Sequence, residues 1–435
     1  MTTLLGDIET RLRQLIEAIA SEPAPRKGPG APLVLPAMLL WSSVIVGVLR
    51  GFRTQAELWR LVSMYGLWSY PRVSVSEEAV RRRLIGATEQ MRLFFEQITD
   101  LLAARLAPYA ERSLASFAAM VVALDAMTLD PVVRQLPMLQ NGKRVPGSEL
   151  PGKLATRFDL RLQQWQRVEY VANPHENDKV RAQSLVEDLP RGSLILADLG
   201  YFAFAWFDGL TEKGHFWISR IREKTTYEVI HVFYAEGETR DELVWLGQYR
   251  ADRAAHAVRL VQFRANGHVA RYITNVLDPA VLPIGEIARV YARRWDVELA
   301  FKLVKRELGL HLLWSSNVEI ILSQVWAVLL ISQILQGIRK EVAGRAEVDV
   351  FEVSMPLLVE AVVRFAERGL DPLEAIVERG RFGRIIRPSR RLKIQAPEIP
   401  PERITPLPKG LSLQRRARYA RRKCGPRKAK PGVQL

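Results

Sequence analysis

Residues 285–308 read GEIARVYARRWDVELAFKLVKREL, a stretch that contains no proline and has Glu286 in its first turn. Both features favour an α-helix over the whole stretch. At 100° per residue, four chemically distinct side chains of this helix fall within an arc of about 60°. They are Tyr291, Arg294, Glu298 and Lys305. One interpretation of this face is a solvated surface with ordinary helical ion pairs.

The spacing of these four residues, Y-x2-R-x3-E-x6-K, resembles the signature of the DDE transposases of bacterial insertion sequences, specifically the family numbered four. The resemblance implies a ribonuclease-H-like α/β fold, in which a mixed sheet is flanked by helices. It implies that Glu298 binds metal as the third member of a carboxylate triad. It also implies that Tyr291, Arg294 and Lys305 hold the DNA end near the reacting phosphate. The residue types suit that role, because arginine offers phosphate a bidentate fork and lysine a point charge.

Two aspartates follow strand-like segments upstream, where the first two members of such a triad would lie. VVALDAMTLD, from residue 121, runs through apolar residues into Asp125, and SLILADLGYF, from residue 193, runs into Asp198. Both runs predict buried strands. Either aspartate alone could simply cap a following helix. Two such strands followed by the Glu298 helix favour a catalytic triad of Asp125, Asp198 and Glu298.

A cluster of three carboxylates needs a cation. Two unit charges about 4 Å apart repel by roughly 4 kcal/mol at an effective dielectric near 20. Oxygen donors suit Mg²⁺, and two Mg²⁺ ions, for which Mn²⁺ could substitute, would clamp the attacking and leaving oxygens of a phosphodiester. Asp125 would bridge the two ions, with Asp198 and Glu298 flanking. The sequence has no HExxH motif, cysteine-rich site, GxSxG elbow or Walker loop, which disfavours zinc, nucleophilic and nucleotide-driven chemistry.

Positive charge is concentrated at the C-terminal end of the chain. The 435 residues carry a formal net charge of +16, which suggests a polyanionic partner such as double-stranded DNA. Residues 381–435 contain 17 Lys and Arg against Glu398 and Glu402, which leaves 46 basic and 45 acidic residues before them. We predict a tail that is extended or disordered in isolation and orders on a phosphate backbone; a merely solubilising tail is the alternative. The basic residues expected to bind DNA are Arg415, Arg416, Arg418, Arg421, Arg422 and Lys423.

The N-terminal region is a better candidate for reading DNA sequence, because backbone contacts carry little sequence information. Residues 54–66 and 75–84 predict two helices joined by a turn, with Ser76 as the N-cap of the second helix. This pattern resembles a helix-turn-helix, whose second helix enters the major groove. The residues that would project there are Arg81, Arg82 and Arg83. A helical bundle with an arginine-rich surface is an equally good interpretation.

The segments between the acidic residues fit the order of a ribonuclease-H-like fold. Residues 156–172 alternate as in a β-hairpin, residues 178–189 predict a short helix, and residues 215–220 predict a fifth strand. Residues 226–277 predict successive strands with turns at EGE and NGH, and they resemble the β-rich insertion of the family. In relatives this insertion helps to hold the distorted transposon end. Trp245 could stack there on an extruded base, although a packed core tryptophan is the favoured interpretation.

Trp295 and Phe301 would pack the helix at 285–308 against the sheet. Three domains follow from these segments. They are a helical N-terminal DNA-binding domain (1–112), a ribonuclease-H-like catalytic domain (113–345, with the β-rich insertion at about 221–275), and a C-terminal helical segment with the basic DNA-binding tail (346–435).

Residues 33–49 carry no charge and approach the length of a membrane span, but Pro36 and Gly47 interrupt them, so we predict a buried core helix. The single cysteine and an N-terminal stretch unlike a secretory signal predict a soluble, cytoplasmic protein without a membrane partner. The absence of a Walker loop disfavours a nucleotide cofactor. The resemblance implies a bacterial protein associated with the nucleoid.

The sequence therefore predicts a transposase that binds the inverted-repeat ends of an insertion sequence, and the resemblance implies that it acts as a homodimer. It would cleave them by two-metal phosphodiester hydrolysis and transfer the 3′ ends to target DNA. Two alternatives remain open. A metal-dependent nuclease of the same fold would share the three carboxylates without the other signature residues. A domesticated, non-catalytic DNA-binding protein would keep the basic tail and the N-terminal reader.

Overall fold

The chain forms two compact units in the computed structural model. One comprises residues 1–196 and 290–393, and the other comprises residues 197–289 and 394–435; we call them the α/β unit and the β-rich unit. The predicted α/β class is confirmed, whereas the predicted boundaries of the three domains stay a prediction. The structure describes residues 14, 35–67, 71–129, 152–247, 252–265, 267–315, 317–389 and 396–419.

The sheet of the α/β unit has four strands in the order β3-β2-β1-β4. Strands β1, β2 and β3 pair antiparallel, whereas β4 runs parallel to β1. The predicted strands and the hairpin between the two aspartates are thus confirmed. The apolar runs at Val121 and Leu194 are fully buried, as expected for central strands. The strand bounds are β1 Val121–Thr128, β2 Lys153–Asp159, β3 Gln164–Val171 and β4 Leu194–Ala197.

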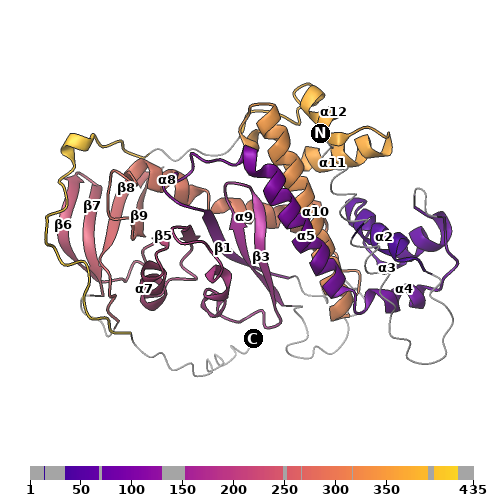
Figure 1. Ribbon diagram of the computed structural model, residues 1–435, viewed down its shortest axis with the longest axis horizontal. Coiled ribbons are helices and arrows are strands. Elements are labelled where there is room, and N and C mark those ends of the chain that lie inside the picture. Colours follow the sequence, from indigo (N-terminus) through magenta and orange to yellow (C-terminus); the bar gives the residue numbers. More distant parts are fainter. Residues whose placement is uncertain are drawn as a thin grey trace, which may run out of the picture. The chain divides into compact units, whose positions relative to one another are not determined.

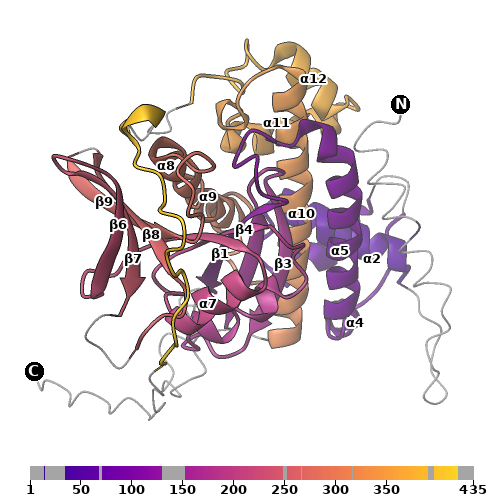
Figure 2. The same ribbon diagram turned by 60° about the vertical axis from the view of Figure 1, so that its left-hand side comes forward.

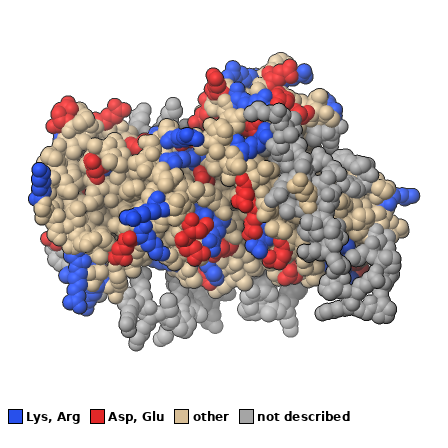
Figure 3. All heavy atoms as spheres, viewed as in Figure 1, with Lys and Arg blue, Asp and Glu red and all other residues tan. Residues whose placement is uncertain are grey.

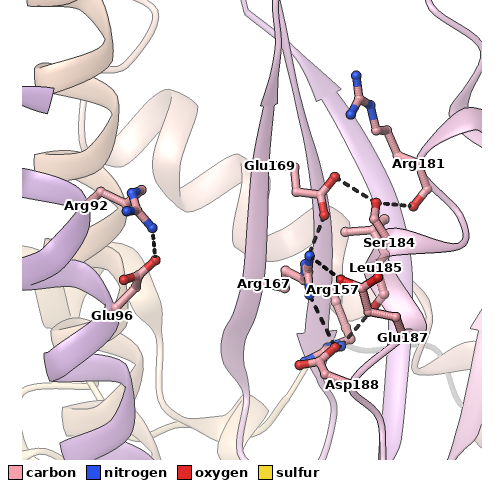
Figure 4. A network of polar contacts seen from close by, with 10 residues as sticks. All are labelled: Arg92, Glu96, Arg157, Arg167, Glu169, Arg181, Ser184, Leu185, Glu187 and Asp188. Carbon is pink, nitrogen blue, oxygen red and sulfur yellow. Dashed lines mark hydrogen bonds and ion pairs between the residues drawn. The ribbon is translucent and has the colours of Figure 1, made fainter. Parts of the chain in front are cut away.

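The short helix predicted at 178–189 is instead two single 3₁₀ turns, Asp178–Val180 and Ser184–Val186. Side-chain bonds to the hairpin hold this segment in place (Figure 4). Arg157 of β2 donates to both carboxylate oxygens of Asp188, at 2.5 and 2.9 Å, and to the carbonyl of Leu185 at 2.8 Å. These bonds anchor the segment that leads into β4.

The N-terminal helices follow the predicted capping pattern. Thr54 and Glu57 form a reciprocal capping box at the start of α3, and the Ser76 hydroxyl accepts from Ala79 N at the start of α4. The uncharged stretch around Val44 forms α2, with most of its side chains buried, so the predicted core helix is confirmed. The bounds are α2 Ala37–Leu49, α3 Gln55–Arg60, a π-helical turn at Leu61–Tyr65, α4 Glu77–Leu84 and α5 Thr88–Leu106.

Helix α10 (Val318–Arg345) is the central helix of this unit and packs along α5 in both views (Figures 1 and 2). It is long and apolar enough to cross a membrane, but 89% of its most apolar window is buried inside the protein. It also binds the sheet through polar bonds, because Gln333 donates to Trp165 O at 2.8 Å and Ser332 accepts from Trp165 Nε1 at 2.9 Å. Helix α10 is therefore a core helix. Two shorter helices follow, α11 (Met355–Glu367) and α12 (Pro372–Arg379).

The β-rich unit contains an antiparallel sheet with the order β5-β9-β8-β7-β6 and helix α7, and it extends into the helix that begins at Ile284. The predicted fifth strand and the predicted succession of strands are confirmed, and the turn after Glu236 contains Gly237 at φ +55°. The bounds are α7 Phe204–Glu212, β5 Phe216–Arg220, β6 Tyr227–Glu236, β7 Thr239–Leu246, β8 Val258–Ala265 and β9 His268–Thr274.

Residues 396–419, here called the C-terminal strap, run as an extended segment along this sheet (Figure 2). Thr405 N donates to Phe233 O at 2.8 Å, and Ala257 N donates to Leu413 O at 3.0 Å. The extended conformation predicted for the tail is confirmed here, but this part is ordered by contacts with the protein itself. Its apolar residues pack against a cluster of Phe233, Leu243, Trp245 and Ala257; they are Ile404, Leu407, Leu411 and Leu413.

Charges of both signs are interspersed on the surface shown in Figure 3. This agrees with the near balance of 46 basic and 45 acidic residues before residue 381. The positive excess of the chain therefore belongs to its C-terminal part.

Candidate active site

The stretch predicted as one helix is divided into three pieces: α8 (Ile284–Ala292), α9 (Trp295–Lys302) and a π-helical turn (Leu303–Glu307). Backbone bonds tighten between α8 and α9, where Arg293 N donates to Val290 O at 3.0 Å and Asp296 N donates to Arg293 O at 2.8 Å. The angular argument for one continuous helix therefore fails across the break and again at the π-turn.

Arg294 contacts two of the three predicted catalytic carboxylates. Its Nη2 donates to Glu298 Oε1 at 2.7 Å, one helical turn on, and its Nη1 lies 3.6 Å from Asp125 Oδ2. The Arg294 side chain is 15% exposed, against 20% for Asp125 and 32% for Glu298. Burial by itself lowers the pKa of Arg294, but the bond to Glu298 and the neighbouring negative charges outweigh it and raise that pKa. The cluster is thus two carboxylates held by one cation.

Strand β1 and helix α9 position this cluster. Asp125 was expected at the carboxyl end of its strand, but β1 continues to Thr128 and Asp125 lies inside it, opposite Thr156 of β2. Thr156 Oγ1 donates to Asp125 O at 3.0 Å, and Ala126 N donates to Asp125 Oδ1 at 2.8 Å. The first bond holds the backbone of Asp125 and the second orients its carboxylate. Helix α9 packs on β1 (Figure 1).

The two aromatic residues expected to pack this helix behave differently. Phe301 stacks on Trp165 of β3 with ring centroids 5.1 Å apart, as predicted. Trp295 is 55% exposed, so its predicted packing against the sheet is wrong. Its place at the first residue of α9, after the break, turns it towards solvent, where its ring lies 6.0 Å from the Arg294 guanidinium carbon.

Asp198 directly follows the end of β4, as predicted. Its Oδ1 accepts from Gly200 N at 2.8 Å, which shapes the turn after the strand. In the parallel pairing of β1 with β4, Ala123 lies opposite Leu196. Asp125 stands two residues after Ala123, and Asp198 stands two residues after Leu196. The pairing of the two strands ends at Ala123 and Leu196 and does not extend to either aspartate.

The other signature residues lie on either side of α9. Tyr291 is 7% exposed on α8, and its carbonyl accepts from Arg294 N at 3.0 Å. Lys305 lies half-buried in the π-turn, and its carbonyl accepts from His311 Nδ1 at 2.6 Å. Their predicted role at the DNA end stays a prediction.

The predicted DNA-reading arginines lie on α4. Arg81 and Arg82 pair with Glu78 of the same helix, at 3.4 and 3.1 Å. Arg83 donates to Leu35 O at 3.3 Å, and burial lowers its pKa. Arg82 is thus the most exposed of the three.

The C-terminal basic residues divide between the strap and the chain beyond it. Arg415 donates to Leu246 O at 2.6 Å and to Ala254 O at 3.0 Å, and its guanidinium carbon lies 4.7 Å from the centroid of the Trp245 ring. Trp245 is 9% exposed and belongs to the apolar cluster of the β-rich unit, as the core interpretation predicts. Arg416 and Arg418 are exposed on the strap. The predicted contacts of Arg421, Arg422 and Lys423 lie outside the described residues.

The donor set of this cluster fits a hard divalent cation. Asp125 and Glu298 present only carboxylate oxygens, the ligands that Mg²⁺ prefers, and a guanidinium already lies between them as a positive charge. Among the residues that the structure describes, no group of three or more Asp, Glu, His or Cys side chains is arranged to hold a metal ion. A divalent ion bound by both carboxylates would therefore compete with Arg294.

Residues 120–334, which include the whole of this cluster, match the Transposase DDE domain family. The match supports a transposase of the DDE class. Two curated relatives agree with this class. The chain is 26% identical over 162 residues to the transposase InsG of the insertion sequence element IS4 from Escherichia coli strain K12. The aligned region covers 34% of this chain and 35% of that protein. The chain is also 24% identical over 195 residues to y4zB, a predicted transposase of Sinorhizobium fredii. That aligned region covers 42% of this chain and 51% of the relative.

The sequence did not reveal the polar residues buried behind the cluster. Arg293 and Asp296 are 7% and 1% exposed, yet Arg293 is adjacent to Arg294 and looks the same in sequence. The helix break decides which of the two neighbouring arginines points inward. The i, i+3 spacing of Arg293 and Asp296 was the one feature of the sequence that could have indicated their ion pair.

Proposed function

We propose that this protein is a transposase that binds the inverted-repeat ends of an insertion sequence, cleaves them and joins the 3′ ends to target DNA. The observation that carries the proposal is the meeting of Asp125 and Glu298 at Arg294, inside the region that matches the transposase DDE domain. Distant elements of the chain, strand β1 and helix α9, supply these carboxylates. Surface ion pairs contribute little stability, so stability alone does not explain why these two carboxylates lie at one guanidinium.

Asp125, Asp198 and Glu298 are proposed to hold two Mg²⁺ ions, or Mn²⁺ in their place. When bound, such ions would activate water and stabilise the charge that develops on the phosphodiester oxygens. Asp125 is fixed by its strand, and Glu298 can turn from Arg294 towards the cation. The assignment of Asp198 rests on its place directly after β4 and on the resemblance of the sequence to the DDE transposases.

Arg294 would change partner during this process. As the carboxylates take up cations, its guanidinium becomes available to a phosphate of the DNA end, which it can bind bidentately. Tyr291 and Lys305 are proposed to hold the same end from α8 and the π-turn. This assignment is supported by their positions, because Tyr291 lies before α9 and Lys305 lies directly after it.

DNA binding outside this site is assigned to Arg81, Arg82 and Arg83 and to the basic C-terminal residues. Arg416 and Arg418 are exposed on the strap and carry the chain towards the basic stretch beyond residue 419. We propose that the protein acts in the bacterial cytoplasm, with the nucleoid, as a homodimer that brings two DNA ends together. A stacking role for Trp245 would require Arg415 to leave its ring.

The test is strand cleavage and strand joining on a labelled duplex that carries the candidate element end, with Mg²⁺ and at equal DNA occupancy. Glu298→Ala should abolish both reactions while DNA binding persists. Glu307→Ala, which removes an exposed carboxylate from the following turn, is the matched control and should retain both.

Three outcomes separate the candidate functions. Cleavage with joining supports a transposase, and cleavage without joining supports a nuclease of the same fold. Binding without either reaction in the native chain supports a non-catalytic DNA-binding protein.

A further inference from the structure

A buried ionic cluster lies directly behind the signature residues. Arg293 Nε donates to Asp296 Oδ2 at 2.6 Å, and Arg293 Nη1 lies 2.6 Å from Glu111 Oε2. Gln163 Nε2 also donates to Asp296 Oδ2, at 3.0 Å. Burial by itself lowers the pKa of Arg293, but Asp296 and Glu111 outweigh it and raise that pKa. The Arg293 guanidinium is therefore firmly charged in the interior.

This cluster ties the start of α9 to the turn of the β2–β3 hairpin. Gln163 occupies that turn with a left-handed backbone, φ +60°, and its Nε2 also donates to Leu160 O at 2.9 Å. Arg293 Nη2 donates to the same carbonyl at 3.3 Å. The side chains of Gln163 and Arg293 thus both donate to the carbonyl oxygen of Leu160, and this shared bond holds the start of α9 against the hairpin.

The cluster also sets the rotation of α9 about its axis. Asp296 stands two residues from Arg294 and two from Glu298, and two residues correspond to about 200° of helical rotation. Anchoring Asp296 on the buried side therefore points Arg294 and Glu298 to the opposite side, where Asp125 lies. Arg293 and Arg294 are adjacent at the break between α8 and α9, and they face different partners.

We infer that Arg293 and Asp296 are positioning residues of the active site. Their buried pair fixes the break and the rotation that bring Arg294 and Glu298 to Asp125. The inference rests on the proposed function, since it concerns the cleavage reaction assigned to those carboxylates. Neither residue touches the proposed reacting groups; both act through the orientation of α9.

The test compares Asp296→Asn with Glu341→Gln. Glu341 is 5% exposed and forms two bonds with Arg105 between α5 and α10, at 2.9 and 3.0 Å, so Glu341→Gln also removes the charge of a largely buried ion pair. It should destabilise the same unit without moving α9. Thermal unfolding measures the stability loss of each variant, which makes Glu341→Gln the matched control.

The expected result is a split between binding and rate. Asp296→Asn should lower the cleavage kcat by about 10²-fold with the KM for DNA changed less than threefold, because a misplacement on the order of 1 Å suffices for such a loss. Mn²⁺ affinity, measured by the free-ion signal in electron paramagnetic resonance, should fall about tenfold. Glu341→Gln should keep both quantities within twofold of the native chain.

A neutral pair provides the second variant. Arg293→Gln with Asp296→Asn neutralises the buried pair, can keep one side-chain hydrogen bond, and leaves only Glu111, whose side chain is 24% exposed, without the guanidinium. The double variant should therefore recover at least tenfold of the kcat lost in Asp296→Asn. If Asp296→Asn and Glu341→Gln lose rate and Mn²⁺ affinity equally at equal stability, the positioning role is wrong. If the native chain fails to cleave at all, the proposed function fails instead.

Discussion

The guanidinium of Arg294 lies 3.6 Å from the carboxylate of Asp125 in strand β1. Arg294 directly precedes helix α9, so this contact joins the start of α9 to the sheet. The same guanidinium bonds to Glu298 at 2.7 Å. The positive charge of Arg294 offsets the repulsion between the two acids, and a divalent ion proposed to bind both of them would compete with it.

Replacement of Arg294 by glutamine should make the protein more responsive to Mg²⁺. Without the guanidinium, Asp125 and Glu298 lose their shared counter-ion, so the melting temperature without divalent ions should fall. Mg²⁺ should then raise it by more than in the native chain, because an ion bound only to the folded state stabilises it. Each kcal/mol corresponds to about 2–4 °C for a domain of this size class. Thermal unfolding with and without MgCl₂ measures the difference.

The matched control for that experiment is Arg294→Gln combined with Glu298→Gln. The double variant lacks both the guanidinium and one carboxylate, so the additional Mg²⁺ effect should disappear. An equal Mg²⁺ shift in all three proteins would mean that the ion binds elsewhere.

Lys305→Ala should weaken binding to the DNA end and lower its salt dependence. If Lys305 binds one phosphate, the slope of log K against log[salt] should decrease in magnitude by about 1. Lys302→Ala removes an exposed lysine from the preceding helix and is the control. Fluorescence anisotropy over a salt series measures both slopes. Identical slopes for the two variants would remove Lys305 from the interface.

Two truncations should separate the roles of the strap and of the chain beyond it. Ending the chain after Tyr419 removes six Lys and Arg and should weaken DNA binding while the melting temperature stays unchanged. Ending it after residue 395 also removes the apolar strap residues that cover the cluster around Trp245, so the melting temperature should fall as well. Calorimetry and DNA titration measure both effects. Equal melting temperatures for the two truncations would show that the strap adds no stability.

Asp188→Asn should change how stability depends on pH. The bond from Arg157 lowers the pKa of Asp188 below its ordinary value of about 4, so the pair stabilises the fold above that value and less as pH falls through the lower folded pKa. The difference in urea midpoint between native chain and variant should be constant from pH 7 to 6 and shrink below about pH 4. Glu96→Gln removes a surface pair with Arg92 (Figure 4) and should change the midpoint little at any pH. A difference that persists unchanged at pH 3 would contradict this assignment.

Local patterns of the sequence predicted most of the elements. The apolar runs before Asp125 and Asp198 gave central strands, the alternation from Thr156 gave a hairpin, and Thr54 and Ser76 marked helix starts. Burial of a strand, pairing across a short turn and capping of a helix depend on residues close together in the chain.

The arrangement of the candidate site was decided by tertiary structure. The sequence placed Tyr291, Arg294, Glu298 and Lys305 on one continuous helix, which the structure divides after Ala292. The break is held by bonds from Arg293 and Asp296 to Glu111 and Gln163, residues far away in the chain. No local pattern could indicate them.

By itself, the sequence determined the strands, the capped helices, the acidic residues available to a metal and the concentration of positive charge near the C-terminal end. Only the tertiary structure decided that Arg294 links Asp125 to Glu298, that Trp295 faces solvent, and that the strap packs on the β-rich unit. The physical reason is that periodicity and capping are local, whereas the burial of a charge or an apolar segment depends on partners that only folding brings near.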